Sequence, residues 1–159
     1  MREILFRGKP TERFKDFLLI RKEYDKSGFV HGSLVIDGLG RTYICFGGMC
    51  THNSIINNGI TTMVEVIPET VGQFTGLLDK NGKKIFEGDI VKTEFGRLCT
   101  VVWFSSRAFC GWDLATIKTV ENCVHTKPPT SVNLFKSDCL KIVGNIHDNP
   151  ELMGKKEKE

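Results

Sequence analysis

Short hydrophobic runs alternate with turn residues along most of the chain. The runs are rich in Val, Ile, Phe and Thr, and pairs such as Ser27-Gly28, Asp37-Gly38 and Asn81-Gly82 separate them. Such runs, bounded by such pairs, are typical of strands joined by tight turns. The predicted strands are 1–7, 29–36, 42–46, 61–67, 89–94, 98–104, 108–115 and 140–143. The pattern therefore predicts a mainly β, largely antiparallel fold.

Helical signals are few and local. Residues 11–24 carry apolar positions at helical spacing behind Thr11 as an N-cap, although their apolar run 17–20 also suits a buried strand. Residues 149–154 follow the order of N-cap asparagine, first-turn proline and C-terminal glycine. We expect a helix in the first region and one or two helical turns in the second.

The segment 68–84 is expected to clasp the two halves of the chain together. A short helical turn is predicted at 68–74, with Glu69 and Thr70 capping its free N–H groups. The apolar positions that share nearly one helical face are Val71, Phe74 and Leu77. Gly72 and Gly76 would permit the chain to reverse.

Two turns and two loops follow from local residue chemistry. Asn81-Gly82 is the preferred pair for a type I′ hairpin, and Glu87-Gly88-Asp89 indicates a turn into the next strand rather than a pair of catalytic carboxylates. Residues 47–58 and 121–131 have no strand or helix pattern, and Pro128-Pro129 excludes a central strand from the second. Both segments are predicted to be loops.

Composition indicates a folded protein without a membrane anchor. Hydrophobic residues make up 40% and charged residues 26% of the 159 positions, and this composition excludes an intrinsically disordered chain. No apolar run approaches the roughly 18 residues that span a bilayer, and the charged N-terminus does not resemble a signal peptide. We therefore expect a cytoplasmic protein whose six cysteines are reduced thiols.

The charge balance gives little support to a nucleic-acid partner. The net charge is +3, with 9 basic and 6 acidic residues in 1–60 and 13 of each in 61–159. Nucleic-acid binding is dominated by electrostatics and normally needs a concentrated basic face. The sequence predicts that nucleic acid binds weakly and without sequence preference.

No motif for a metal, cofactor or nucleophile is complete. Cys45, Cys50 and His52 are soft ligands at close spacing but lack a fourth, and Cys123 with His125 has a different spacing. No glycine-rich loop leads from a strand into a helix, so the phosphate-binding signature is missing. We expect no structural metal, no cofactor and no enzymatic activity.

Aromatic residues in 99–114 form the strongest candidate binding surface. Trp103, Phe109 and Trp112 fall in what should be two adjacent strands, with Arg97 and Arg107 nearby. Exposed aromatics on a sheet can stack on bases or on a peptide, although aromatics in strands are more often core. The three aromatic residues are therefore candidate binding residues.

Four blocks of sequence, in order, resemble the YopX family of phage and prophage proteins. They are MREILFRGK at 1–9, GFVHGSLVIDG at 28–38, VIPETVGQFTGLLDKNGKKIFEGDIV at 66–91 and IVGNIHDNPEL at 142–152. The resemblance implies a small phage-encoded protein with an SH3-type β-barrel in its C-terminal half. The chain departs from the family pattern in the long interval 10–27 and at Phe29 and His31, which replace the usual aromatics.

Together these observations predict an organisation and a function. We expect an N-terminal β-rich subdomain at 1–67, the connecting clasp at 68–84, an SH3-like barrel with a C-terminal turn at 85–154, and a disordered tail at 155–159. The expected function is that of a non-enzymatic, homo-oligomeric assembly or interaction module acting on an unknown phage or host protein. The alternative is a nucleic-acid-binding module that uses the barrel face.

Overall fold

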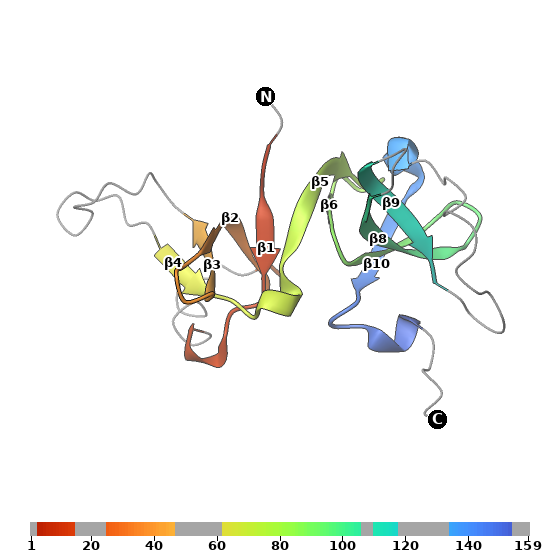
Figure 1. Cartoon of the computed structure of the whole chain (residues 1–159). Helices are drawn as coiled ribbons and strands as arrows, with labels where there is room; N and C mark the ends of the chain where they lie inside the picture. The colour runs from red at the N-terminus through yellow and green to blue at the C-terminus, as the bar shows by residue number, and fades with distance from the viewer. Residues whose placement is uncertain (1–2, 15–24, 47–61, 106–109, 118–133, 154–159) are drawn as a thin grey trace. The chain divides into compact units, whose positions relative to one another are not determined.

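The computed structural model describes residues 3–14, 25–46, 62–105, 110–117 and 134–153 (Figure 1). The chain divides into two compact units, Met1–Phe74 and Thr75–Glu159. The boundary between them falls inside the segment 68–84. No helix in the described ranges is long and apolar enough to cross a membrane.

The first unit is built on an antiparallel sheet. Its strands are β1 (Phe6–Gly8), β2 (Val30–Ile36), β3 (Thr42–Phe46), β4 (Thr62–Glu65) and the beginning of β5 (Gly72–Leu78), in the order β4-β3-β2-β1-β5. Leu34, Ile44 and Val64 are aligned across three of these strands. Such alignment places their side chains on one face of the sheet. The buried cluster of this unit comprises Val30, Ile44, Val64 and Val66.

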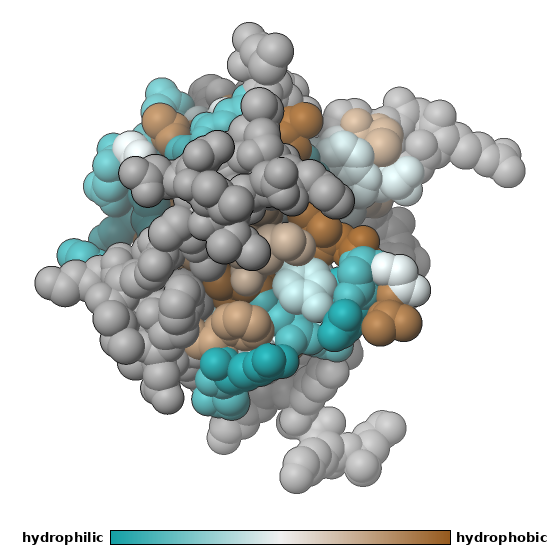
Figure 2. Space-filling view, turned by 90° about the vertical axis from the view of Figure 1, so that its left-hand side faces the viewer, coloured by the Kyte–Doolittle hydropathy of each residue, from teal (hydrophilic) through white to brown (hydrophobic). Residues whose placement is uncertain are grey.

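The outer surface of the first unit is mixed in character. Ile36, Leu39 and Met63 are exposed hydrophobic residues. Figure 2 views the side of the molecule that carries β4, and there hydrophobic residues lie among hydrophilic ones. Scattered exposed apolar side chains of this kind are normal for protein surfaces.

The second unit contains a four-stranded antiparallel sheet. Its elements after β5 are β6 (Lys84–Phe86), β7 (Asp89–Lys92), β8 (Leu98–Ser105), β9 (Cys110–Thr116), the 3₁₀ turn η2 (Leu134–Cys139), β10 (Lys141–Asn145) and η3 (Pro150–Met153). The strand order is β10-β7-β8-β9, while β6 pairs with β5. The buried cluster consists of Ile85, Val91, Cys99, Val101, Leu114 and Leu140. The mainly β prediction is confirmed.

Among the described residues, four turns repeat one design, with a three-residue loop closed by glycine, and the last three of them join paired strands. The residues that open them are Asp25, Asp37, Asp79 and Thr93. In each turn the opening N–H donates to the carbonyl four residues later, and the glycine three residues later donates back. The glycines, with φ between 75° and 80°, are Gly28, Gly40, Gly82 and Gly96. In this design, which is common in hairpins, a type I turn is followed by a left-handed residue.

The type I′ prediction for Asn81-Gly82 is therefore wrong. The loop has three residues rather than two, because Asp79 and Lys83 form the closing pair. The carboxylate of Asp79 accepts hydrogen bonds from the N–H groups of Asn81 and Lys83, at 2.8 and 2.9 Å. These bonds stabilise the type I geometry. The type I′ prediction considered only the asparagine–glycine pair and therefore missed the contribution of Asp79.

The helical prediction for 68–74 is correct only at its start. The 3₁₀ turn η1 (Pro68–Thr70) begins after Ile67 without a side-chain cap, so the capping role predicted for Glu69 is wrong. The Thr70 hydroxyl instead donates to the Ile67 carbonyl at 2.6 Å and accepts from the Lys9 N–H at 2.9 Å. Thr70 thereby fastens the turn to the segment that follows β1.

The predicted helical face of Val71, Phe74 and Leu77 does not form, because this stretch is strand β5. β1 supplies an antiparallel partner, with Phe6 opposite Gln73 and Arg7 opposite Gly72. Backbone pairing of this kind overrides a weak helical spacing that glycines already disfavour.

Other local predictions have mixed outcomes. Residues 12–14 are helical, and the rest of the predicted helix 11–24 lies outside the described residues. The C-terminal turn is confirmed as η3, where the Leu152 N–H donates to the Asn149 carbonyl at 3.0 Å. The loops predicted at 47–58 and 121–131 and the tail 155–159 also lie outside the described residues. The turn η2 had no signal that we recognised.

Candidate functional site

Trp103 and Trp112 face each other across the β8–β9 pair. They are register partners, their ring centroids are 4.8 Å apart, and the ring planes meet at 79°. Edge-to-face geometry is favourable because the positive edge of one ring meets the negative face of the other. The prediction that these aromatics lie in adjacent strands is confirmed.

This tryptophan pair extends the core of the second unit to its surface. Val101 and Leu114, the next pair on the same face, are both buried. Trp112 packs against the core cluster and is partly buried, whereas 48% of Trp103 is exposed. The Trp112 indole N–H is buried and, among the described residues, has no hydrogen-bond acceptor. The pair is thus an apolar surface continuous with the core.

The remaining aromatics of this region do not join the pair. Phe109 lies outside the described residues. Phe104 is one residue beyond Trp103 on β8 and pairs with Gly111, so it lies on the opposite face of the sheet. The candidate surface within the described residues is therefore limited to Trp103 and Trp112.

A second candidate site is an open groove of about 730 Å³ in the same unit. We call it the lysine groove, because it is lined by Lys80, Lys92 and Lys141, together with Glu94, Phe95 and Cys139. Lys92 and Lys141 are direct register partners across β7 and β10. Within the described part of the chain, none of the three ammonium groups takes part in an ion pair. The groove concentrates positive charge that the sequence spreads over distant segments.

Asp79 fixes the position of Lys80 beside β10. One carboxylate oxygen accepts from the turn, and the other accepts from the Ile142 N–H at 3.1 Å. The Lys80 N–H also donates to the Leu140 carbonyl at 2.9 Å. Desolvation raises the pKa of Asp79, but the N–H groups of Lys83, Ile142 and Asn81 outweigh it and hold this pKa below its usual value.

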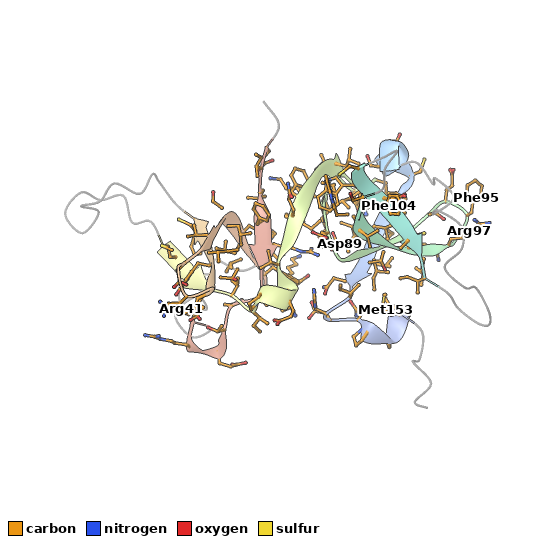
Figure 3. All side chains as sticks on the ribbon, in the orientation of Figure 1. Arg41, Asp89, Phe95, Arg97, Phe104 and Met153 are labelled. Carbon is orange, nitrogen blue, oxygen red and sulfur yellow. The ribbon has the colours of Figure 1, made fainter. Side chains whose placement is uncertain are left out.

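The β7–β8 turn presents an aromatic ring at the edge of the lysine groove. Thr93 opens this turn, Gly96 has φ of 80°, and Phe95 between them is 79% exposed. Figure 3 shows Phe95 and Arg97 together at the end of this hairpin. The pair Phe95-Gly96 is recognisable in the sequence as a turn. Because turns lie at the surface, a phenylalanine within one was the sequence signal that could have indicated this site.

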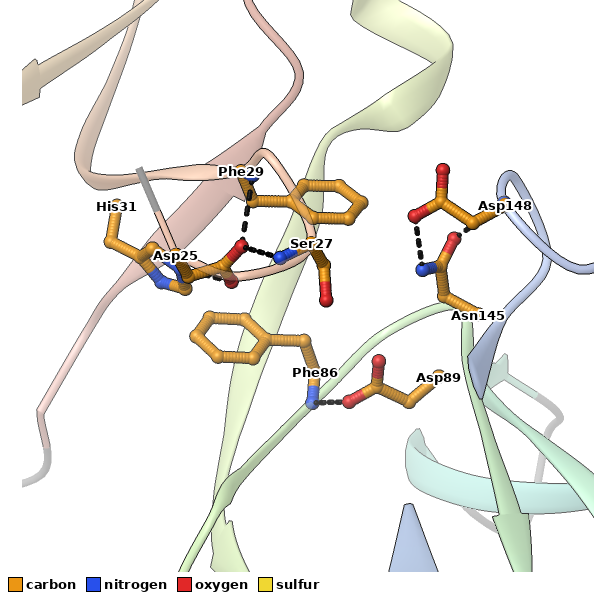
Figure 4. A network of polar contacts seen from close by, with 8 residues as sticks. All are labelled: Asp25, Ser27, Phe29, His31, Phe86, Asp89, Asn145 and Asp148. Atoms are coloured by element: carbon orange, nitrogen blue, oxygen red, sulfur yellow. Dashed lines mark hydrogen bonds and ion pairs between the residues drawn. The ribbon is translucent and has the colours of Figure 1, made fainter. Parts of the chain in front are cut away.

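The other clustered polar side chains form hydrogen bonds with backbone N–H groups (Figure 4). Asp89 is only 2% exposed and accepts from the Phe86 N–H at 2.8 Å, which confirms the turn interpretation of Glu87-Gly88-Asp89. The Asn145 side chain accepts from the N–H groups of His147 and Asp148, both at 2.9 Å. These groups are engaged in closing turns.

Asp25 shows the same use of a carboxylate, in the first unit. It accepts from the Ser27 and Phe29 N–H groups and lies 2.9 Å from His31 Nε2 (Figure 4). Burial raises the pKa of Asp25, but the hydrogen bond with His31 and those from the backbone lower it overall. His31 thus contacts the carboxylate that closes the turn before β2.

The described residues contain no group of three potential metal ligands. In the part of the chain that the structure describes, Cys45, Cys99, Cys110 and Cys139 are not joined in disulfides. Four of the residues that could bind zinc by residue type, Cys50, His52, Cys123 and His125, lie outside the described residues.

Comparison with known proteins identifies one family. The family model described as YopX protein matches residues 46–154. No curated protein matches the chain. Among solved structures, the chain is similar to the crystal structure of protein EF1440 from Enterococcus faecalis, with 20% identity, coverage of 96% of this chain and 99% of that chain, and a TM-score of 0.45.

Proposed function

The chain belongs to the YopX family, and from that premise we propose that it is a non-enzymatic, homo-oligomeric protein-interaction module of a phage or prophage. It acts in the bacterial cytoplasm on itself and on a phage or host protein. The second unit is its interaction domain, an SH3-type barrel in which the four-stranded sheet is completed by neighbouring segments.

The observation that supports this function most is the exposed tryptophan of the Trp103–Trp112 pair. Tryptophan is enriched among the few interface residues that dominate binding energy. Trp103 stands on the core face with about half of its surface exposed. Leaving that apolar surface in water is unfavourable by roughly 25 cal/mol per Å². A partner that covers the ring removes this unfavourable exposure.

A second copy of the chain is the simplest partner, because it already carries a matching apolar surface. In a twofold-symmetric dimer the same patch is used on both subunits. Each Trp103 would then pack against the tryptophan pair of the other subunit, where a further edge-to-face contact is favourable. The contact would also cover the β8–β9 end of the core face.

The non-enzymatic character is supported by how the polar groups are used. The carboxylates of Asp25, Asp79 and Asp89 accept backbone hydrogen bonds. A catalytic acid or base needs a group positioned for a substrate proton rather than one committed to a turn. The alternative function, nucleic-acid binding, is favoured by one separate observation, the lysine groove.

Sedimentation velocity across a range of protein concentrations tests the proposal. The wild-type chain should self-associate. Trp103→Ala should raise the dimer dissociation constant by roughly 30-fold, the effect of losing about 2 kcal/mol at an interface hot spot. Phe95→Ala removes another exposed aromatic and serves as the matched control, which should associate like the wild type.

Two results would contradict the proposal. If the wild-type chain stays monomeric at every accessible concentration, the proposed homo-oligomer is wrong. If Trp103→Ala and Phe95→Ala change the dimer dissociation constant equally, the tryptophan pair has no specific role in self-association. Affinity capture from phage-infected cells with wild type and Trp103→Ala in parallel then identifies partners that depend on this surface.

A further inference from the structure

The lysine groove carries an electrostatic cost that the fold itself does not relieve. Lys92 and Lys141 are directly opposite each other on neighbouring antiparallel strands. Like charges in such positions repel and destabilise the sheet. Lys80 adds a third ammonium group from the β5–β6 turn, and Glu94 supplies the one carboxylate among the described residues of the lining. A bound polyanion would neutralise the excess positive charge.

The exposed ring of Phe95 adds a second kind of contact. It occupies the third position of its turn, held there by the Thr93–Arg97 closing pair. Arg97 brings a further positive charge to the same turn. An aromatic ring at the edge of a basic groove is the arrangement by which proteins stack unpaired bases while cations follow the phosphate backbone.

We infer that the lysine groove binds single-stranded nucleic acid without sequence preference. Lys80, Lys92 and Lys141 pair with successive phosphates, and Phe95 stacks on one base. A single strand fits better than a duplex, because bases in a duplex are already stacked and their faces are not accessible to a side chain. The inference rests on the second candidate function and uses residues separate from the tryptophan pair.

Lysine contacts predict how the binding should depend on salt. Each phosphate neutralised on a single strand contributes about −0.7 to the slope of log affinity against log salt concentration. Three lysine contacts give a slope of about −2. Because few charges are involved, binding should be weak at physiological ionic strength, as the overall charge balance predicts.

Fluorescence anisotropy with the full chain and a labelled oligothymidylate of about 15 nucleotides tests the inference. The salt concentration is varied from about 20 to about 200 mM. The wild type should bind with a slope near −2, and each of Lys80→Gln, Lys92→Gln and Lys141→Gln should make the slope shallower by about 0.7. Lys26→Gln is the matched control, because Lys26 follows Asp25 in the same turn design as Lys80 follows Asp79.

The stacking contact has its own control. Phe95→Ala should weaken binding about tenfold with the salt slope unchanged, since it removes stacking and no charge. Leu39 is 80% exposed and occupies the equivalent third position of the Asp37 turn, so Leu39→Ala should bind like the wild type. Phe95→Trp should retain binding.

Several outcomes would overturn the inference. These are no binding at the lowest salt concentration, equal effects of the lysine-groove and control variants, and tighter binding of a duplex of the same length. Competition by polyglutamate as effective as that by oligothymidylate would instead assign the groove to an acidic peptide. Trp103→Ala should leave oligothymidylate affinity unchanged, so this binding and the self-association can fail independently.

Discussion

Replacing Asp79 by asparagine tests how much the second unit depends on one carboxylate. The variant keeps an oxygen for the N–H groups of Asn81 and Lys83 but places an amide nitrogen opposite the Ile142 N–H. One charge-assisted hydrogen bond is lost and a partly buried donor is left without an acceptor. We expect the free energy of unfolding to fall by about 2 kcal/mol.

Urea unfolding followed by tryptophan fluorescence measures this loss. Both tryptophans of the chain, Trp103 and Trp112, lie in the second unit with Asp79, so the signal reports on that unit. With a urea slope of about 2 kcal/mol per M, the midpoint should shift by about 1 M. Asp37→Asn is the matched control from the same turn design, because among the described residues the second oxygen of Asp37 accepts from the side chains of Arg41 and Tyr43 and from no backbone N–H.

The pH dependence gives an independent check of the cause. The folded-state pKa of Asp79 lies below its usual value, so its charge stabilises the fold fully above the unfolded-state pKa of about 3.9. This contribution is lost as the pH falls through the folded-state pKa. The difference between wild type and Asp79→Asn should therefore be constant from neutral pH down to about pH 5 and shrink below about pH 4. An unchanged midpoint at neutral pH, or a difference that does not shrink in acid, would refute the reasoning.

Two further predictions concern the first unit. Gly32→Ala should reduce the melting temperature strongly, because the added methyl group would overlap the Cys45 carbonyl. At Gly38 an added methyl group meets open space, so Gly38→Ala should have little effect. Equal melting temperatures for the two variants would contradict this packing. Thr70→Ala should lower the free energy of unfolding by about 2 kcal/mol, because two hydrogen bonds are lost, whereas Glu69→Ala should change it little. Thermal unfolding followed by circular dichroism compares the two variants. A larger loss of stability in Glu69→Ala than in Thr70→Ala would restore the capping interpretation.

The sequence predicted strands well where alternation and turn residues agreed. The range 42–46 is strand β3 as predicted, and the ranges around β2, β4 and β8 differ by at most a few residues at their ends. In these places the local pattern and the cross-strand partners favour the same backbone. The end of a strand depends on where its partner ends, which a single run of residues does not encode.

Prediction failed where a partner distant in sequence decided the outcome. Residues 72–78 have a weak helical spacing, but pairing with β1 makes them a strand. The roles of Glu69 and Thr70 were not separable from the sequence either. The Thr70 hydroxyl is useful because the Lys9 N–H reaches it, and that contact joins residues far apart in the chain.

The two candidate surfaces differ in the same way. Trp103 and Trp112 lie close enough in sequence for strand alternation to place them together, and the hairpin does so. The lysine groove depends instead on the pairing of β7 with β10 and on the hydrogen bond that the Ile142 N–H donates to Asp79, which bring three separate segments to one place. A balanced count of charges over residues 61–159 therefore says little about the local potential, because the fold decides which charges become neighbours. The salt dependence of oligothymidylate binding measures that local potential directly.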